Sequence, residues 1–392
     1  MAEPLSSSPS SAAASFENEW SALLECASPA QDHQRLVGLF RSVDWTRLFA
    51  LAEDHGVTGH LAASLRGLED LVPPEIRQAL ADRQRARNFL TLRLTAELFR
   101  IVDRFASEGI GALAVKGPVL AMRAYGDPGM RSYGDVDLLV RQRDIRRATE
   151  LMCAAGYAAA IPLSAIDAGK IPGQYLFSMP DSKLIVELHN DRTLRYFPRR
   201  LPLEDFFSRQ VRVRLDSHEV PALSVEDELV LICIHGAKHF WERLMWIADV
   251  AALVSQQRNI DWEQVSASAK EVGAKRMLHM GLRLAGGLPK MPFPERIAPA
   301  VQADAVATHL AAQALTWLPA AGYAAPGLFE RAAFRLRMRG SWLAAPAYLL
   351  RLSLSPTEED WQKGSRLSQN RFLDVLRRPF RLARKYSRSP RD

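Results

Sequence analysis

The clearest structural signal in this chain is Tyr133-Gly134-Asp135-Val136-Asp137-Leu138-Leu139-Val140. Its last three residues form an apolar run suited to one buried strand, and Asp135 and Asp137 stand at the entrance. Side chains two residues apart in a strand point to the same face, so we expect the two carboxylates to project side by side. Like charges this close repel, and burying them costs free energy unless a cation lies between them. A hard divalent metal is the natural counter-charge.

The spacing of this pair carries little weight by itself. Acidic residues are 44 of 392, so acid-x-acid pairs should arise by chance about five times in such a chain. Five are present. Only Asp135 and Asp137 open directly into an aliphatic strand, and this context is what singles them out.

The residues upstream add a second element to the predicted site. Residues 111–115 (Gly-Ala-Leu-Ala-Val) are predicted to form a short strand, which Lys116-Gly117-Pro118 ends before a helical run at residues 119–125. Glycine at a strand-to-helix turn lets backbone N–H groups approach a ligand, a helix N-terminus favours anions, and lysine supplies a point charge. This order of elements predicts a phosphate site that faces a metal site.

Several motifs of the chain resemble a poorly characterised bacterial nucleotidyltransferase family of the DNA polymerase β-like superfamily. The motifs at the centre of the resemblance are Val115-Lys116-Gly117, residues 125–131 (Tyr-Gly-Asp-Pro-Gly-Met-Arg), residues 134–140 and Gly156-Tyr157. The resemblance extends from about Trp45 to about Val254, through residues 44–48, 187–189 and 241–249. It implies an α/β (α+β) fold with a small mixed β-sheet core of nucleotidyltransferase type.

The resemblance also implies an activity, the transfer of a nucleoside monophosphate from a nucleoside triphosphate (NTP) to a hydroxyl acceptor with Mg²⁺ or Mn²⁺. Asp135 and Asp137 would hold the metal. The superfamily places a third acidic residue on a neighbouring strand, where it helps to hold a metal and activates the attacking hydroxyl, and the matching position here is Glu187. A strand glutamate paired with an arginine is the plainer interpretation of Glu187. No residue identifies the acceptor or selects one NTP.

Residues 183–189 (Lys-Leu-Ile-Val-Glu-Leu-His) alternate like a strand and place Glu187 and His189 on one face. His189 is a candidate base, metal ligand or ribose contact, and a hydrogen-bonded core histidine is an equal alternative. Lys116 and the Gly117 turn are expected to steady the phosphates. Lys238 is a candidate triphosphate contact on a helix predicted over residues 224–255, with a solvated helix charge as the alternative.

The rest of the chain divides by composition and periodicity. Residues 1–16 are rich in Ser, Ala and Pro and are expected to be a disordered leader. Helical apolar spacing predicts a helical segment over residues 17–105, and helices again from 224 to 361. The strand and helix alternation is confined to residues 106–223, which we therefore expect to be the catalytic core.

Composition narrows the compartment and the partners. No apolar run reaches 18 residues, so no membrane span is expected. Three cysteines without metal-ligand spacing, and a start unlike a signal peptide, favour the cytoplasm. The net charge is +7, but residues 362–392 hold ten Lys and Arg against two acids, which leaves the body near neutral. This basic tail is expected to solubilise the protein or to contact an anionic membrane or an acidic partner, and nucleic acid is not expected.

Two other functions compete with the transferase. A glycosyltransferase also uses Asp-x-Asp to hold a metal-bound nucleotide sugar, but it normally needs a larger sheet before the motif, where this chain is predicted to be helical. A catalytically degenerate relative that binds a partner is the second rival. It is favoured by Lys116-Gly117-Pro118 in place of the superfamily's usual Gly-Ser or Gly-Gly, and by the 18 residues from Gly117 to Asp135.

Overall fold

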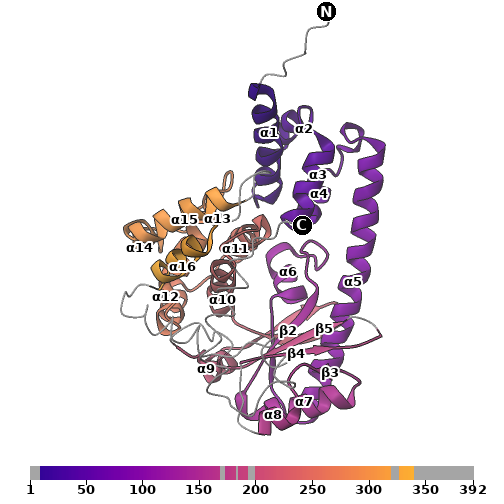
Figure 1. Ribbon diagram of the computed structural model, residues 1–392, viewed down its shortest axis with the longest axis vertical. Coiled ribbons are helices and arrows are strands. Elements are labelled where there is room, and N and C mark those ends of the chain that lie inside the picture. The colour runs from indigo at the N-terminus through magenta and orange to yellow at the C-terminus, as the bar shows by residue number, and fades with distance from the viewer. Residues whose placement is uncertain (1–8, 168–172, 182–183, 193–198, 319–325, 340–392) are drawn as a thin grey trace, which may run out of the picture.

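Helices surround one seven-stranded mixed sheet in the computed structural model, which describes residues 9–167, 173–181, 184–192, 199–318 and 326–339 (Figure 1). The basic tail predicted at 362–392 lies outside these described residues.

Five α-helices precede the sheet: α1 (Pro9–Ala27), α2 (His33–Phe40), α3 (Trp45–Asp54), α4 (Thr58–Ser64) and α5 (Pro74–Ser107), with a 3₁₀ turn at Glu69–Leu71. The strands are β1 (Ala112–Val115), β2 (Asp135–Val140), β3 (Ala158–Ala159), β4 (Gln174–Ser178), β5 (Ile185–His189), β6 (Val211–Leu215) and β7 (His218–Ala222). Between them lie α6 (Gly117–Tyr125), a 3₁₀ turn at Gln142–Asp144, α7 (Ile145–Ala154), α8 (Leu163–Asp167) and α9 (Leu203–Ser208). The helices that follow are α10 (Val225–Lys238), α11 (Leu244–Gln256), α12 (Trp262–Glu271), α13 (Lys275–Ala285), α14 (Ala298–Ala303), α15 (Ala305–Trp317) and α16 (Leu328–Arg337).

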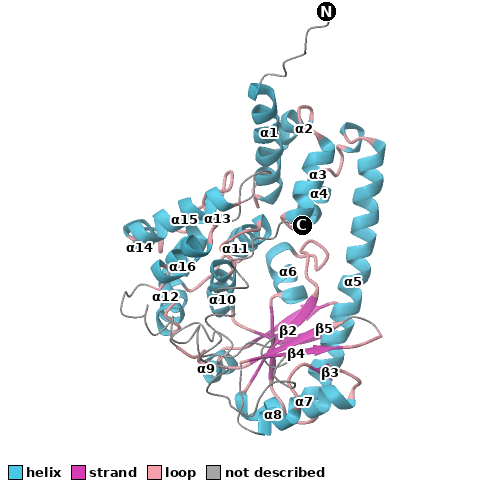
Figure 2. Ribbon diagram, viewed as in Figure 1, coloured by secondary structure: helices cyan, strands magenta, loops and turns pink. Residues whose placement is uncertain are grey.

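The strands run in the order β3-β4-β5-β2-β1-β7-β6. The central strand β2 is antiparallel to β1 and parallel to β5. Parallel strands need a long crossover connection, and the chain between β2 and β5 supplies it with α7, α8, β3 and β4. The expected α/β fold with a small mixed sheet, helices before it and helices after it is confirmed (Figure 2).

The two faces of the sheet pack against different helices. Val136, Leu138 and Val140 of β2 point to the face covered by α5 and α7 and join their buried side chains in one cluster. Leu139 points to the opposite face and belongs to a second cluster, which combines the N-terminal helices with α10 to α16. Asp137 lies on that second face because it is two residues from Leu139.

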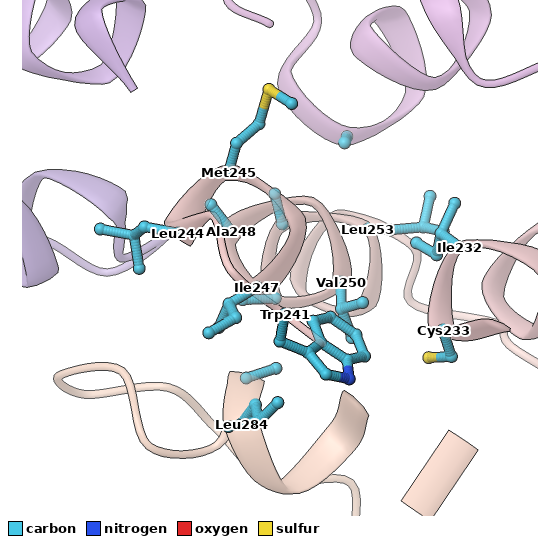
Figure 3. Packing of buried hydrophobic residues seen from close by; sticks show 14 of the residues in the cluster. Ile232, Cys233, Trp241, Leu244, Met245, Ile247, Ala248, Val250, Leu253 and Leu284 are labelled. Carbon is cyan, nitrogen blue, oxygen red and sulfur yellow. The ribbon is translucent and has the colours of Figure 1, made fainter. Parts of the chain in front are cut away.

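The second cluster is tightly packed around Trp241, which is fully buried (Figure 3). A Cβ atom at Gly236 of α10 would lie 2.6 Å from the indole ring, and one at Gly281 of α13 would lie 2.6 Å from Cys233 Sγ. Glycine at both positions therefore lets α10 and α13 close on the ring. This packing holds α10 and α13 together within the second cluster.

Local signals in the sequence account for several helix ends. The Ser224 side chain accepts a hydrogen bond from Asp227 N at the start of α10, as its helix-start pattern predicts. Gly156 after α7 has φ of 92°, the left-handed conformation predicted for it. At the N-terminus, α1 begins at Pro9, inside the segment expected to be a disordered leader at residues 1–16. The helix runs from Pro9 to Ala27 and buries Ala22 and Leu23.

None of the helices in the described part of the chain has the length and hydropathy that crossing a bilayer requires.

Candidate active site

The candidate site is built on the parallel pairing of β2 with β5. Asp137 pairs with Glu187 in this register, and Leu139 pairs with His189. Registered neighbours point to the same face, so Asp137, Glu187 and His189 all project toward the face on which Leu139 packs. The two carboxylates come from strands that are 50 residues apart in the sequence.

Three side chains of this face form one close group. His189 Nε2 lies 2.8 Å from Asp137 Oδ1 and 3.4 Å from Glu187 Oε2. One donor atom from each of the three lies within 4.8 Å of the others. Asp137 is buried, while Glu187 and His189 are partly accessible. Two of the three side chains are therefore in contact with solvent.

Lys116 supplies the cation nearest to this group. Its Nζ lies 2.9 Å from Asp137 Oδ2. The residue has φ of 57° and ψ of −138°, a conformation that is rare for a side chain larger than glycine, and Gly117 follows with φ of 49°. Such backbone strain persists only where the surrounding structure holds it, and it is frequent at functional sites.

The electrostatics of the group follow from burial and these contacts. Burial favours the neutral form of Asp137, but Lys116 and the hydrogen bond with His189 outweigh it and hold the pKa of Asp137 below its usual range. Burial also opposes protonation of His189. Its hydrogen bonds to Asp137 and Glu187 outweigh that effect and raise the pKa of the imidazole. Asp137 is thus an ionised carboxylate within a set of donors and acceptors.

Asp135 lies outside the group of three. It is at the first position of β2, opposite Ile185, on the same face as Asp137. Burial, followed by the charge of Asp137, raises the pKa of Asp135 to about 6. A carboxyl group with this shift gains from any added cation, which would favour its ionised form.

Lys238 is exposed and is the last residue of α10. Burial, followed by the charges of Lys238 and Lys116, lowers the pKa of His239 to about 4. Lys116 also lowers the pKa of His235, after burial. Both lysines therefore act on the same pair of histidines, and the C-terminal end of α10 is close to the turn at Lys116.

Sequence reasoning missed Gln174. This residue of β4 pairs with His189, and its Nε2 donates to Glu187 Oε2 over 2.8 Å. The side chain orients Glu187 from the side opposite to β2. A lone glutamine belongs to no sequence motif. The one available signal was that Gln174 lies shortly before the predicted strand of Glu187.

The donor set fits a divalent cation of the magnesium or manganese type. Two carboxylates are the ligands that such ions prefer, and an imidazole is accepted by Mn²⁺ more readily than by Mg²⁺. Asp137 and Glu187 would hold the ion, with His189 as a third ligand and Asp135 available next to them. Among the acidic, histidine and cysteine side chains of the described residues, Asp137, Glu187 and His189 lie close enough together to hold a metal ion.

Comparison with known proteins adds a family to this geometry. A family model described as “Uncharacterised nucleotidyltransferase” matches residues 41–288. No curated protein matches the chain. Among solved structures, an antigenic nucleotidyltransferase-like protein from Paracoccidioides brasiliensis is 12% identical, with a TM-score of 0.35, over 55% of this chain and 92% of that chain. The residues matched by the family model include the whole site described above.

Proposed function

Because the chain belongs to the family of uncharacterised nucleotidyltransferases, we propose that it transfers a nucleoside monophosphate from an NTP to a hydroxyl acceptor with bound Mg²⁺ or Mn²⁺. The observation that carries the proposal is the meeting of Asp137, Glu187 and His189 on one face of the sheet, with Lys116 on Asp137. We further infer that the family falls in the DNA polymerase β-like superfamily and that the protein acts in the bacterial cytoplasm.

The proposed roles follow from the chemistry of each side chain. Asp137 and Glu187, with Asp135 next to them, would hold the cation. The bound ion would neutralise charge that develops on the phosphates and would align the attacking oxygen. Glu187, which accepts a hydrogen bond from Gln174, would take the proton of the acceptor hydroxyl.

The positive groups on the same side are the proposed phosphate contacts. Lys116 and the backbone of the Gly117 turn would bind the phosphates at the start of α6. Lys238 would meet the triphosphate from α10, and His189 would either complete the metal site or contact the ribose. Lys116 is held by Asp137 in the structure, and an NTP offers it a second anion.

Turnover of labelled NTPs tests the proposal. The full chain is incubated with each α-labelled NTP and Mg²⁺ or Mn²⁺, and pyrophosphate release and label transfer are measured. We expect Glu187→Gln to lower release roughly 100-fold or more, the size of a lost general base, and Asp137→Asn to lower it at least as much. Glu263→Gln is the matched control, an exposed acid of α12 that should leave the rate unchanged.

Turnover of nucleotide sugars and calorimetry with nucleotides separate the competing functions. A preference for nucleotide sugars would replace the transferase with a glycosyltransferase. Absence of any nucleotide binding, measured by calorimetry with Mn²⁺ present, would leave a binding protein that keeps the fold. Turnover that survives both Asp137→Asn and Glu187→Gln would remove these residues from the chemistry.

A further inference from the structure

A buried ion pair joins two motifs to which the proposed chemistry gives no role. Arg131 Nε donates to Asp249 Oδ2 over 2.8 Å, and Tyr125 OH donates to Asp249 Oδ1 over 2.9 Å. The side chains of Arg131 and Asp249 are 6% and 2% exposed. Both oxygens of the carboxylate are thus satisfied inside the protein.

The burial of this pair makes it a rigid contact. Ion pairs are costly to bury, and breaking one by removing a partner leaves an uncompensated charge inside the protein. Asp249 is shielded from solvent. Its two hydrogen bonds fix the positions of the Arg131 guanidinium and the Tyr125 phenol relative to α11. The contact therefore defines one geometry for three separate parts of the chain.

Those parts are the ones that frame the candidate site. Tyr125 is the last residue of α6, the helix that begins directly after Lys116. Arg131 lies in the connection from α6 to β2, four residues before Asp135. Asp249 lies in the middle of α11, in the helical half that follows the sheet. One carboxylate on α11 thus holds both the end of α6 and the approach to β2.

Neighbouring contacts support the same connection. A Cβ atom at Gly59 of α4 would collide with the carbonyl oxygen of Met130, so the connection also packs closely on the N-terminal helices. Arg123 of α6 pairs with the buried Glu228 of α10 over 2.6 Å, a second tie from α6 to the helical half.

We infer that Arg131 and Asp249 are positioning residues that act as one unit, through which α11 sets the placement of Asp135 and Asp137. The inference rests on the proposed function for its link to metal binding. The helical half after the sheet then contributes to the site, because α11 holds β2, the strand that carries Asp135 and Asp137. Tyr125 contributes the second hydrogen bond and ties α6, with Lys116 at its start, to the same carboxylate.

The test compares the full chain with Asp249→Asn, Arg131→Gln and the double variant, using two measurements. Hydrogen exchange followed by mass spectrometry reports on peptides that cover residues 127–137, and titration with Mn²⁺ reports on the affinity of the site. Each single variant should speed exchange in this segment about tenfold and weaken Mn²⁺ binding about tenfold, the low end of the range for residues that orient metal ligands. The double variant should do no more than either single one.

Asp227→Asn is the matched control. Asp227 of α10 is equally buried and receives Arg209 Nε over 3.1 Å, but it does not touch the connection to β2. It should leave exchange at residues 127–137 and Mn²⁺ affinity unchanged. Arg131→Lys should recover part of the protection, because it keeps the cation. If Asp249→Asn does not fold, Tyr125→Phe carries the same comparison with the loss of one hydrogen bond.

The outcomes separate this inference from the proposed function. A wild-type chain that binds no Mn²⁺ would refute the proposed metal site, while the exchange data would still decide whether the pair fixes the segment. Exchange at residues 127–137 that matches the Asp227→Asn control would overturn the inference. Effects of the two single variants that add in the double variant would also overturn it, because residues that act as one unit do not add.

Discussion

Lys116 Nζ lies 2.9 Å from Asp137 Oδ2, so the lysine that follows β1 neutralises an aspartate of the neighbouring strand. The same lysine stands at the start of α6, where a phosphate group would bind. Its charge is therefore shared between the carboxylate that it contacts and the nucleotide proposed to bind next to it.

Substitution of Lys116 separates these two roles. We expect Lys116→Met to raise the KM for NTP about tenfold or more, since a charge-assisted hydrogen bond contributes about 1.5–3 kcal/mol. Affinity for Mn²⁺ should not fall, because the variant removes a cation that competes for Asp137. Steady-state kinetics and Mn²⁺ titration check both, with Lys270→Met of α12 as the control. A KM that stays at its wild-type value would exclude Lys116 as a phosphate contact.

Gln174 is predicted to matter through Glu187. Gln174→Leu removes the donor 2.8 Å from Glu187 Oε2 and leaves the carboxylate free to turn away from Asp137. We expect a loss of Mn²⁺ affinity of about tenfold, as for other residues that orient a metal ligand, without a change in unfolding temperature beyond a few degrees. Gln264→Leu on α12 controls for the loss of a glutamine. Unchanged affinity in Gln174→Leu would show that Glu187 needs no second support.

His60 is predicted to make stability depend on pH. The ring is buried in α4, and within the described residues neither ring nitrogen has a hydrogen-bond partner. Burial, followed by the charge of Arg87, lowers the pKa of His60 from 6.5 to about 4. Below pH 6.5 His60 is protonated in the unfolded chain, whereas in the folded chain it becomes protonated only at about pH 4. The contribution of His60 is thus present above pH 6.5 and is lost as the pH falls to 4, about 3 kcal/mol in all.

Urea unfolding between pH 4.5 and 7 measures this effect. His60→Phe should reduce the slope of unfolding free energy against pH by the equivalent of one proton, about 1.4 kcal/mol per pH unit. The exposed His33 of α2 is the control, and His33→Gln should keep the wild-type slope. A slope that is the same in His60→Phe and wild type would mean that His60 takes up its proton in the folded state.

Deletion of residues 362–392 tests the basic tail, which has a net charge of +8 from ten Lys and Arg and two acids. No candidate site residue lies in this segment, so nucleotide turnover should be unchanged. Binding to vesicles that contain anionic lipid at low salt should be lost, since each basic residue near such a surface contributes about 1 kcal/mol. Vesicles of neutral lipid are the control. Lost turnover in a folded deletion variant would assign the tail's arginines to the active site.

The strand that carries the candidate site could be predicted from local sequence. A short aliphatic run after Asp135 and Asp137 predicts a buried strand, and the period of two places both aspartates on one face, as β2 shows. The same period predicted that Glu187 and His189 share a face of β5. Local chemistry also predicted the start of α10 at Ser224 and the left-handed Gly156. These features depend on neighbours within a few residues, which the sequence displays directly.

Which of these side chains meet depends on long-range packing. The parallel register of β2 and β5 sets Asp137 next to Glu187 and leaves Asp135 opposite Ile185, beside the close group of Asp137, Glu187 and His189. The register between strands 50 residues apart depends on the packing of both sheet faces, which no local pattern encodes. Gln174 on Glu187, and Asp249 on Arg131, follow from the same long-range packing. The sequence does not show these two contacts, because each exists only once the chain has brought its two partners together.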